Sequence, residues 1–295
     1  MSADTGTGKS IIGAAVACSI SDIEKDEKLV SFILMQNNAL VDQYARTFSK
    51  YGEADFFQIK GANTYPCDAL RKFARIPDAN ADSCVEKKVS DAVKENVCSS
   101  CEYKQAKKWL NSTLNLISNY SYYFVSKMWS GHLHDRAITI FDEAHTLNNI
   151  FCEHNAIHVT AEKLETYAKI CEQDLAPMAI EQAAQFKRLK TILMQGKING
   201  DNYNNFISAL SKTYKECHKY AAKKVDEEQD MTTSNKYSKI AKMFFGLGCK
   251  IGDLLHYKYE HVFEYTAETH EISIKPVFIG AMSSVLLGPK NLFMS

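Results

Sequence analysis

The pattern of hydrophobic and polar positions along the chain predicts an α/β fold. Short apolar runs alternate with segments in which apolar residues recur every three or four positions. The first pattern indicates strands and the second indicates helices. The expected strands are 29–35, 56–59, 114–117, 137–141, 272–279 and 291–294, with helices expected at about 9–22 and 38–50. Strands that alternate with helices are typical of a parallel sheet covered by helices.

Two segments interrupt this alternation. Residues 61–112 show weak alternation and contain four cysteines, so we expect a small insert that depends on something other than a large core. Residues 155–265 carry apolar side chains at helical spacing, for example at Leu164, Ala168 and Cys171, and predict a second, helical insert.

Composition narrows the class of protein. The 295 residues are 45% hydrophobic and 24% charged, which argues against bulk disorder. The 35 basic and 35 acidic residues cancel, so a nucleic-acid surface would have to be a local patch. No apolar run approaches the roughly 18 residues that span a membrane, and no signal peptide is apparent. We therefore expect an intracellular protein of the cytoplasm, nucleoid or nucleus with no membrane partner.

The amino-terminal segment Ala3–Ser10, ADTGTGKS, fits the phosphate-loop pattern, with alanine in place of the first glycine. Glycines let backbone N–H groups point at phosphate oxygens, and the following helix adds its N-terminal dipole. A lysine reaches the β- and γ-phosphates, and a serine hydroxyl binds Mg²⁺. A simple glycine-rich turn that caps a helix is the alternative interpretation. The expected nucleotide contacts are Gly6, Thr7, Gly8, Lys9 and Ser10.

An acidic segment follows the apolar run at 137–141. Its sequence is Asp142-Glu143-Ala144-His145. The carboxyl end of a buried parallel strand is where ligands bind in open α/β sheets. Asp142 can hold Mg²⁺, and Glu143 can orient and deprotonate an attacking water molecule. A strand that runs into an ordinary acidic turn is the alternative, which the upstream phosphate loop disfavours.

The four cysteines of the first insert form a candidate metal site. Thiolates suit iron–sulfur clusters or zinc, and a Cys-x2-Cys pair can hold one metal centre. Zinc usually takes two such pairs, whereas here only one is short, and four free or buried thiols are a further alternative. The other cysteines fall in helical or apolar contexts and are expected in the core. The candidate ligands are Cys67, Cys84, Cys98 and Cys101.

The helical insert carries basic and aromatic residues that could follow a nucleic-acid strand, because cations bind phosphates and aromatic rings stack on bases. Solvated lysines and core aromatics are the ordinary alternative. A second candidate basic patch lies beside Cys101, at Lys104, Lys107 and Lys108. The candidates in the insert are Lys187, Arg188, Lys190, Lys212, Lys215, Lys219, Lys223 and Lys224, with Tyr203, Phe206, Tyr214 and Tyr220.

Several of these segments together resemble the XPD/DinG-like, iron–sulfur-containing branch of superfamily 2 helicases. GTGKS and DEAH resemble the two nucleotide-binding motifs of that superfamily. The remaining resemblance lies in residues 33–43 (motif Ia), residues 114–120 (the strand and turn before DEAH), Cys101–Ala106 (the segment with the last cluster cysteine) and Phe293–Ser295 (the start of motif III).

The resemblance implies a RecA-like P-loop motor lobe formed by residues 1–60, 113–150 and 270–295. It also implies an inserted iron–sulfur domain at 61–112, with a [4Fe–4S] cluster on the four cysteines, and a helical Arch insert at 151–269. ATP and Mg²⁺ are the implied nucleotide and metal. Lys9 and Asp142 would then bind phosphate and Mg²⁺, Glu143 would activate water, and His145 would couple the nucleotide site to neighbouring motifs.

The implied activity is ATP hydrolysis coupled to 5′-to-3′ movement on single-stranded or forked DNA. The second RecA-like lobe of such helicases is missing from this sequence, so we expect very slow hydrolysis by this piece alone. An arginine supplied from outside the site is worth about 10³- to 10⁵-fold in rate in comparable hydrolases. The alternatives are an iron–sulfur DinG-like nuclease, or a nucleic-acid-binding module with a degenerate motor, against which the intact Lys9, Asp142 and Glu143 argue.

Overall fold

The computed structural model describes residues 8–23, 29–48, 56–84, 90–196, 198, 200–257, 260–277, 280 and 286–295. The chain forms two compact units. The sheet unit comprises Met1–Pro66, Asn96–His154 and Phe278–Ser295, and the helical unit comprises Cys67–Glu95 and Asn155–Val277. The cysteine-bearing insert expected at 61–112 is thus divided between the two units.

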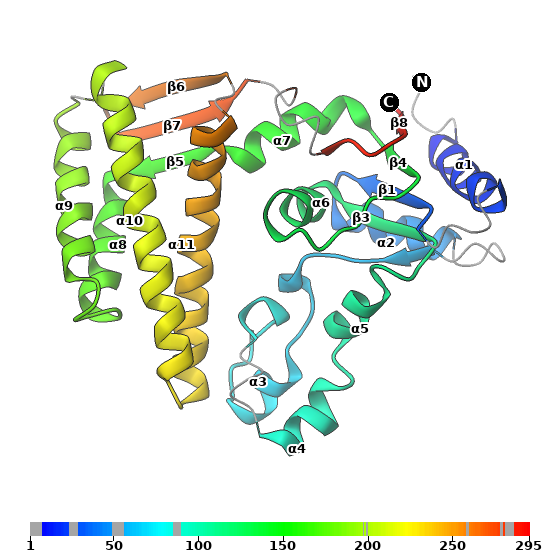
Figure 1. The fold of residues 1–295 in the computed structure, drawn as a ribbon, viewed down its shortest axis with the longest axis horizontal. Helices are drawn as coiled ribbons and strands as arrows, with labels where there is room; N and C mark the ends of the chain where they lie inside the picture. The colour runs from blue at the N-terminus through cyan, green and yellow to red at the C-terminus, as the bar shows by residue number, and fades with distance from the viewer. Residues whose placement is uncertain are drawn as a thin grey trace. The chain divides into compact units, whose positions relative to one another are not determined.

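The sheet unit is built on five parallel strands in the order β2-β3-β1-β4-β8 (Figure 1). Two of the three inner strands, β1 and β4, are buried along their whole length, which explains why each is largely apolar in sequence. The five strands are β1 (Ser31–Met35), β2 (Phe56–Gln58), β3 (Asn115–Asn119), β4 (Ile138–Phe141) and β8 (Asn291–Phe293).

Helices α1 (Lys9–Ile23) and α2 (Asn38–Phe48) share one core with the sheet. Gly13 allows α1 to approach β8 closely, because a Cβ atom at this position would lie 2.9 Å from Met294 Cε. Aromatic side chains of α6 (Tyr120–Val125) and α7 (Leu147–Asn155) pack with Phe141 into a second cluster.

Short helical segments complete the loops of both units. They are η1 (Ala62–Thr64), α3 (Asp68–Phe73), η2 (Ala81–Ser83), α4 (Asp91–Val93), η4 (Lys94–Cys98), α5 (Glu102–Trp109), η5 (Ser126–Ser130) and η6 (Ala144–Thr146).

The helical unit contains four long helices and a small antiparallel sheet of order β5-β7-β6 (Figure 1). Its core includes a cluster of four aromatic rings, Tyr167, Phe186, Tyr214 and Phe244. The elements are β5 (Ile157–Thr160), α8 (Ala161–Gln173), α9 (Ile180–Met194), α10 (Gly200–Glu227), α11 (Met231–Tyr257), β6 (His261–Thr266) and β7 (Glu271–Pro276).

The strand expected at 272–279 forms, but it joins the small sheet of the helical unit instead of the parallel sheet. Its burial alternates, so one face packs on the core and the other does not. That pattern is typical of an antiparallel strand, whereas a central parallel strand is buried on both faces. Residues 270–277 therefore lie outside the sheet unit, although the resemblance implied that they belong to the motor lobe. No helix in the described part of the chain is long and apolar enough to cross a membrane.

Candidate functional site

The described end of the phosphate loop leads directly into helix α1. Gly8 has a φ of 80°, a backbone conformation that favours glycine, and its carbonyl accepts hydrogen bonds from the N–H groups of Ile11 and Ile12. The hydroxyl of Tyr44, on α2, donates to the carbonyl of Ser10 at 2.9 Å and so ties α2 to the first turn of α1. The remaining loop residues Gly6 and Thr7 lie outside the described residues.

The acidic segment is held by main-chain contacts where β4 ends. Asp142 N–H donates to Leu34 on β1, and Ala144 N–H donates to Met294, which follows β8, at 2.7 Å. The buried hydroxyl of Tyr120 donates to the carbonyl of Asp142 at 2.6 Å. These contacts come from three different elements, so they fix the direction in which the carboxylates leave the sheet.

The two segments meet at this edge of the sheet. Lys9 Nζ lies 3.2 Å from Glu143 Oε1, and the Ser10 side chain hydrogen-bonds Asp142. His145 Nδ1 lies 3.3 Å from the other oxygen of Glu143. Lys9 and Ser10 precede Glu143 and Asp142 by about 133 positions in the sequence. They nevertheless lie together in space, as the phosphate-loop and DEAH patterns predict. Apart from Gly8, every expected site residue of these two motifs that the structure describes therefore takes part in this cluster.

The cluster places two carboxylates together in a partly buried setting. Asp142 is only 6% exposed. Burial and then the neighbouring Glu143 raise the pKa of Asp142, while hydrogen bonding from the Glu143 N–H, the charge of Lys9 and the Ser10 hydroxyl act in the opposite direction. A divalent cation would stabilise the ionised form of Asp142. Carboxylate and hydroxyl oxygens are also the ligands that Mg²⁺ prefers, so the residues present fit a magnesium ion.

The sequence gives no indication that the hydroxyl groups of Tyr44 and Tyr120 support the site. Tyr44 and Tyr120 occupy apolar positions of their helices and read as core residues, and both are in fact buried. A buried tyrosine needs a hydrogen-bond partner for its hydroxyl, which is the one clue available. The carbonyl that accepts this hydrogen bond is set by the packing of the helices against the sheet. No local sequence pattern predicts that packing.

The candidate metal ligands fall into two pairs. Cys67 and Cys84, both in the helical unit, are joined by a side-chain hydrogen bond that is the main cause lowering the pKa of Cys67 to about 6. Cys98 and Cys101 belong to the sheet unit, where the Cys101 N–H donates to the Cys98 carbonyl at 3.3 Å. Among the described residues no group of three or more histidine, cysteine or acidic side chains could hold a metal ion. A pair with one readily ionised thiol nevertheless fits a soft metal centre.

Several candidates for nucleic-acid contact are structural residues. Phe206 and Tyr214 are 3% and 1% exposed and belong to the core of the helical unit, so neither can stack on a base without unfolding. Tyr203 packs against Phe263 and hydrogen-bonds His261. Aromatic residues at helical spacing were ambiguous between core and surface, and burial resolves the ambiguity.

The basic candidates also divide. Lys187 and Lys190 on α9 form ion pairs with Glu172 and Glu165 on α8. In contrast, four exposed lysines follow one face of α10 at intervals of three or four residues, and we name them the α10 lysine stripe. They are Lys212, Lys215, Lys219 and Lys223.

Comparison with known proteins supports the fold and no finer assignment. No family model and no curated protein matches the chain. A solved structure titled "Truncated XPD" aligns with 99% of this chain and 87% of its own, at a TM-score of 0.51 and 15% sequence identity. At that identity the likeness concerns the fold alone. The chain thus has an α/β fold that is distantly similar in structure to truncated XPD.

Proposed function

We propose that this chain is the nucleotide-binding motor lobe of an ATP-dependent DNA helicase that moves 5′ to 3′ on single-stranded DNA. One observation carries the proposal: Lys9 and Ser10 at the start of α1 contact Glu143 and Asp142 at the end of β4. A phosphate-binding lysine, a hydroxyl, a buried aspartate and a second carboxylate at one sheet edge form the set that hydrolysis of a nucleoside triphosphate requires.

Each residue has a distinct role in the proposed reaction. Lys9 binds the β- and γ-phosphate oxygens, and Ser10 with Asp142 holds Mg²⁺, which neutralises developing charge on the phosphates when bound. Glu143 orients the attacking water and accepts its proton. His145, in contact with Glu143, positions that carboxylate.

The contact between Lys9 and Glu143 links binding to catalysis. Lys9 cannot bind phosphate and keep its full ion pair with Glu143, because one ammonium group serves both anions. Nucleotide binding therefore competes with the ion pair and leaves the carboxylate available to accept a proton. The pair thus holds the catalytic base neutralised until a nucleotide arrives.

The enzymatic test is Mg²⁺-dependent ATP hydrolysis, with and without single-stranded DNA, by the wild-type chain and by Lys9→Ala and Glu143→Gln variants. We expect slow hydrolysis that DNA stimulates and that both substitutions abolish. Glu268→Gln, an exposed change in the turn after β6, is the matched control and should retain full activity. Hydrolysis that survives Lys9→Ala would refute the assignment, and DNA binding by a wild-type chain that hydrolyses no ATP would favour a binding module.

We also propose that Cys67, Cys84, Cys98 and Cys101 hold a [4Fe–4S] cluster. Support comes from the hydrogen-bonded Cys67–Cys84 pair and the lowered pKa of Cys67, because thiolates are the ligands of such clusters. Anaerobically purified protein should show broad absorption in the visible range and about four irons per chain. Cys84→Ser should lose this signal, whereas Cys249→Ser should keep it. Bound zinc without iron would reject the cluster but not the motor.

The α10 lysine stripe is the proposed contact for the DNA backbone. Its four exposed ammonium groups lie on one helix face, with only short-range partners such as Glu227 for Lys223 at 3.6 Å. Each lost phosphate contact should reduce the slope of log affinity against log salt by about 0.7 on single strands. We expect this reduction for Lys215→Gln but not for Lys239→Gln on α11. Equal slopes for both variants and the wild type would exclude the stripe.

A further inference from the structure

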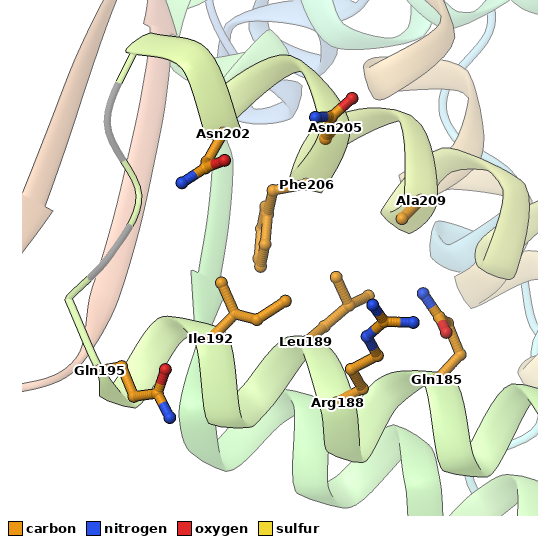
Figure 2. Close-up of a pocket in the computed structure, with 9 residues that line it drawn as sticks. All are labelled: Gln185, Arg188, Leu189, Ile192, Gln195, Asn202, Asn205, Phe206 and Ala209. Carbon is orange, nitrogen blue, oxygen red and sulfur yellow. The ribbon is translucent and has the colours of Figure 1, made fainter.

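The helical unit has a groove between α9 and the first half of α10, and core residues form its floor (Figure 2). Figure 2 shows Phe206 extending from α10 toward Leu189 and Ile192 on α9. Leu189 and Phe206 are only 1% and 3% exposed, so their side chains already pack the two helices together. The groove is therefore a consequence of helix packing, in contrast to a strained residue that lies in the sheet unit.

Glu143 has a backbone conformation that is unusual for a residue with a side chain. Its φ is 53° and its ψ is 46°, which is the left-handed region. Glycine adopts this conformation readily, whereas any other residue is strained in it because of its Cβ atom. Such strain persists only where neighbouring groups hold it, and it is concentrated at functional sites. A glycine at this position would relieve the strain but would lack the carboxylate.

Hydrogen bonds hold the peptide groups on both sides of Glu143. In the peptide before it, the Glu143 N–H donates to Asp142 Oδ1 at 3.2 Å. In the peptide after it, the Ala144 N–H donates to the Met294 carbonyl at 2.7 Å. The Glu143 carbonyl accepts two bonds from Thr146, one from its N–H at 2.9 Å and one from its hydroxyl at 2.8 Å. Because φ and ψ are the rotations of these two peptide groups, the bonds fix the direction in which the Glu143 side chain leaves the backbone.

We propose that Thr146 is a positioning residue for Glu143, an inference that rests on the proposed hydrolysis. Its hydroxyl adds a second bond to the Glu143 carbonyl and so resists rotation of that peptide group. The carboxylate is thereby kept where one oxygen lies 3.2 Å from Lys9 Nζ and the other lies 3.3 Å from His145 Nδ1. When a nucleotide draws Lys9 away, the carboxylate keeps its direction, because the main chain sets it.

The first measurement tests the backbone and needs no nucleotide. Carbon-13 shifts of Cα and Cβ distinguish a left-handed from a right-handed residue, and in glutamate-labelled protein the signals of Glu143 are those lost in Glu143→Gln. The wild type and Thr146→Ser should both give left-handed shifts, because serine keeps the hydroxyl. Thr146→Val is close to threonine in shape but lacks the hydroxyl, so the Glu143 signals should move toward right-handed values. Unchanged shifts in Thr146→Val would overturn the proposal.

The second measurement is Mg²⁺-dependent ATP hydrolysis by the full chain, with kcat and KM determined separately. Thr146→Val should lower kcat about 3- to 10-fold, the effect of one neutral hydrogen bond, without raising KM. Thr146→Ser should restore the wild-type kcat. The matched control is Thr166→Val, because this exposed threonine of the helical unit also donates its hydroxyl to a carbonyl, that of Glu162 at 3.0 Å. It should keep the wild-type kcat and KM.

The outcomes separate this inference from the proposed function. A raised KM with unchanged kcat in Thr146→Val, or an equal loss of kcat in Thr146→Ser, would show that Thr146 only stabilises its turn and would overturn the proposal. A wild-type chain that hydrolyses no ATP would instead reject the motor. In that case the carbon-13 shifts still decide whether the Thr146 hydroxyl holds Glu143 in its left-handed conformation.

Discussion

The ion pair between Lys9 and Glu143 predicts an effect that at first looks contradictory: Glu143→Gln should bind ATP more tightly while losing hydrolysis. In the nucleotide-free protein Lys9 Nζ lies 3.2 Å from Glu143 Oε1. A triphosphate must draw the same ammonium group away from this carboxylate. Neutralising residue 143 removes that competition and also removes repulsion between the carboxylate and the phosphates.

The size of the effect follows from the geometry of the pair. At an effective dielectric constant of about 20, two unit charges at this distance attract by roughly 5 kcal/mol. Most of this is offset, because both groups lose hydration and side-chain freedom, and 12% of the lysine and 32% of the glutamate side chain remain exposed. A net coupling of about 1–2 kcal/mol remains, which corresponds to roughly 5- to 30-fold tighter binding.

The assay is a titration of a fluorescent ATP analogue in the presence of Mg²⁺, with Glu143→Gln, Lys9→Met and the double variant compared with wild type. The coupling energy is obtained from the same cycle by urea denaturation of the nucleotide-free proteins. Glu268→Gln controls for the change in net charge. Weaker or unchanged binding by Glu143→Gln, or a coupling energy near zero, would refute the idea that the two anions compete for Lys9.

Three further predictions concern stability and pH. Arg136 is 3% exposed and donates hydrogen bonds to the carbonyls of three residues near 110–114. Burial lowers the pKa of this arginine to about 10, so its charge is costly to keep in the interior. Arg136→Met should lower the free energy of unfolding, measured by urea denaturation, by about 1–3 kcal/mol, because the lost hydrogen bonds outweigh the relief of burying a charge. Gly13→Val should cost about 1–3 kcal/mol, because its side chain would meet Met294, whereas Gly246→Val, with no atom within 4 Å of its Cβ, should stay within about 0.5 kcal/mol. Burial raises the pKa of Asp142 above 3.8, so the folded state holds this proton to higher pH than the unfolded chain and loses stability as pH rises through the shifted pKa. Asp142→Asn should therefore raise the melting temperature at pH 7 more than at pH 4, and an equal rise at both would contradict this.

Local pattern determined much of the sheet unit. The strands that become β1 and β4 could be predicted from the sequence because parallel strands covered on both faces are largely apolar. Strand β3 is buried as well, yet it carries the polar residues Asn115 and Ser118. The helix after the phosphate loop and the acidic residues after β4 could be predicted from the sequence for a chemical reason. Phosphate binding needs small residues and a lysine at fixed spacing, and metal binding needs carboxylates at a strand end.

Tertiary structure decided which of these elements meet. The strand near residue 272 was expected from the sequence, but only tertiary packing placed it beside β5 and β6. Alternation of apolar and polar residues identifies the buried face of a strand and does not identify the strand that pairs with it. Phe206 and Tyr214 proved to be core residues for the same reason, since helical spacing marks a face but does not say what covers it. The contact of Lys9 with Glu143 joins residues far apart along the chain, and only the order of strands in the sheet brings two such distant segments to one edge.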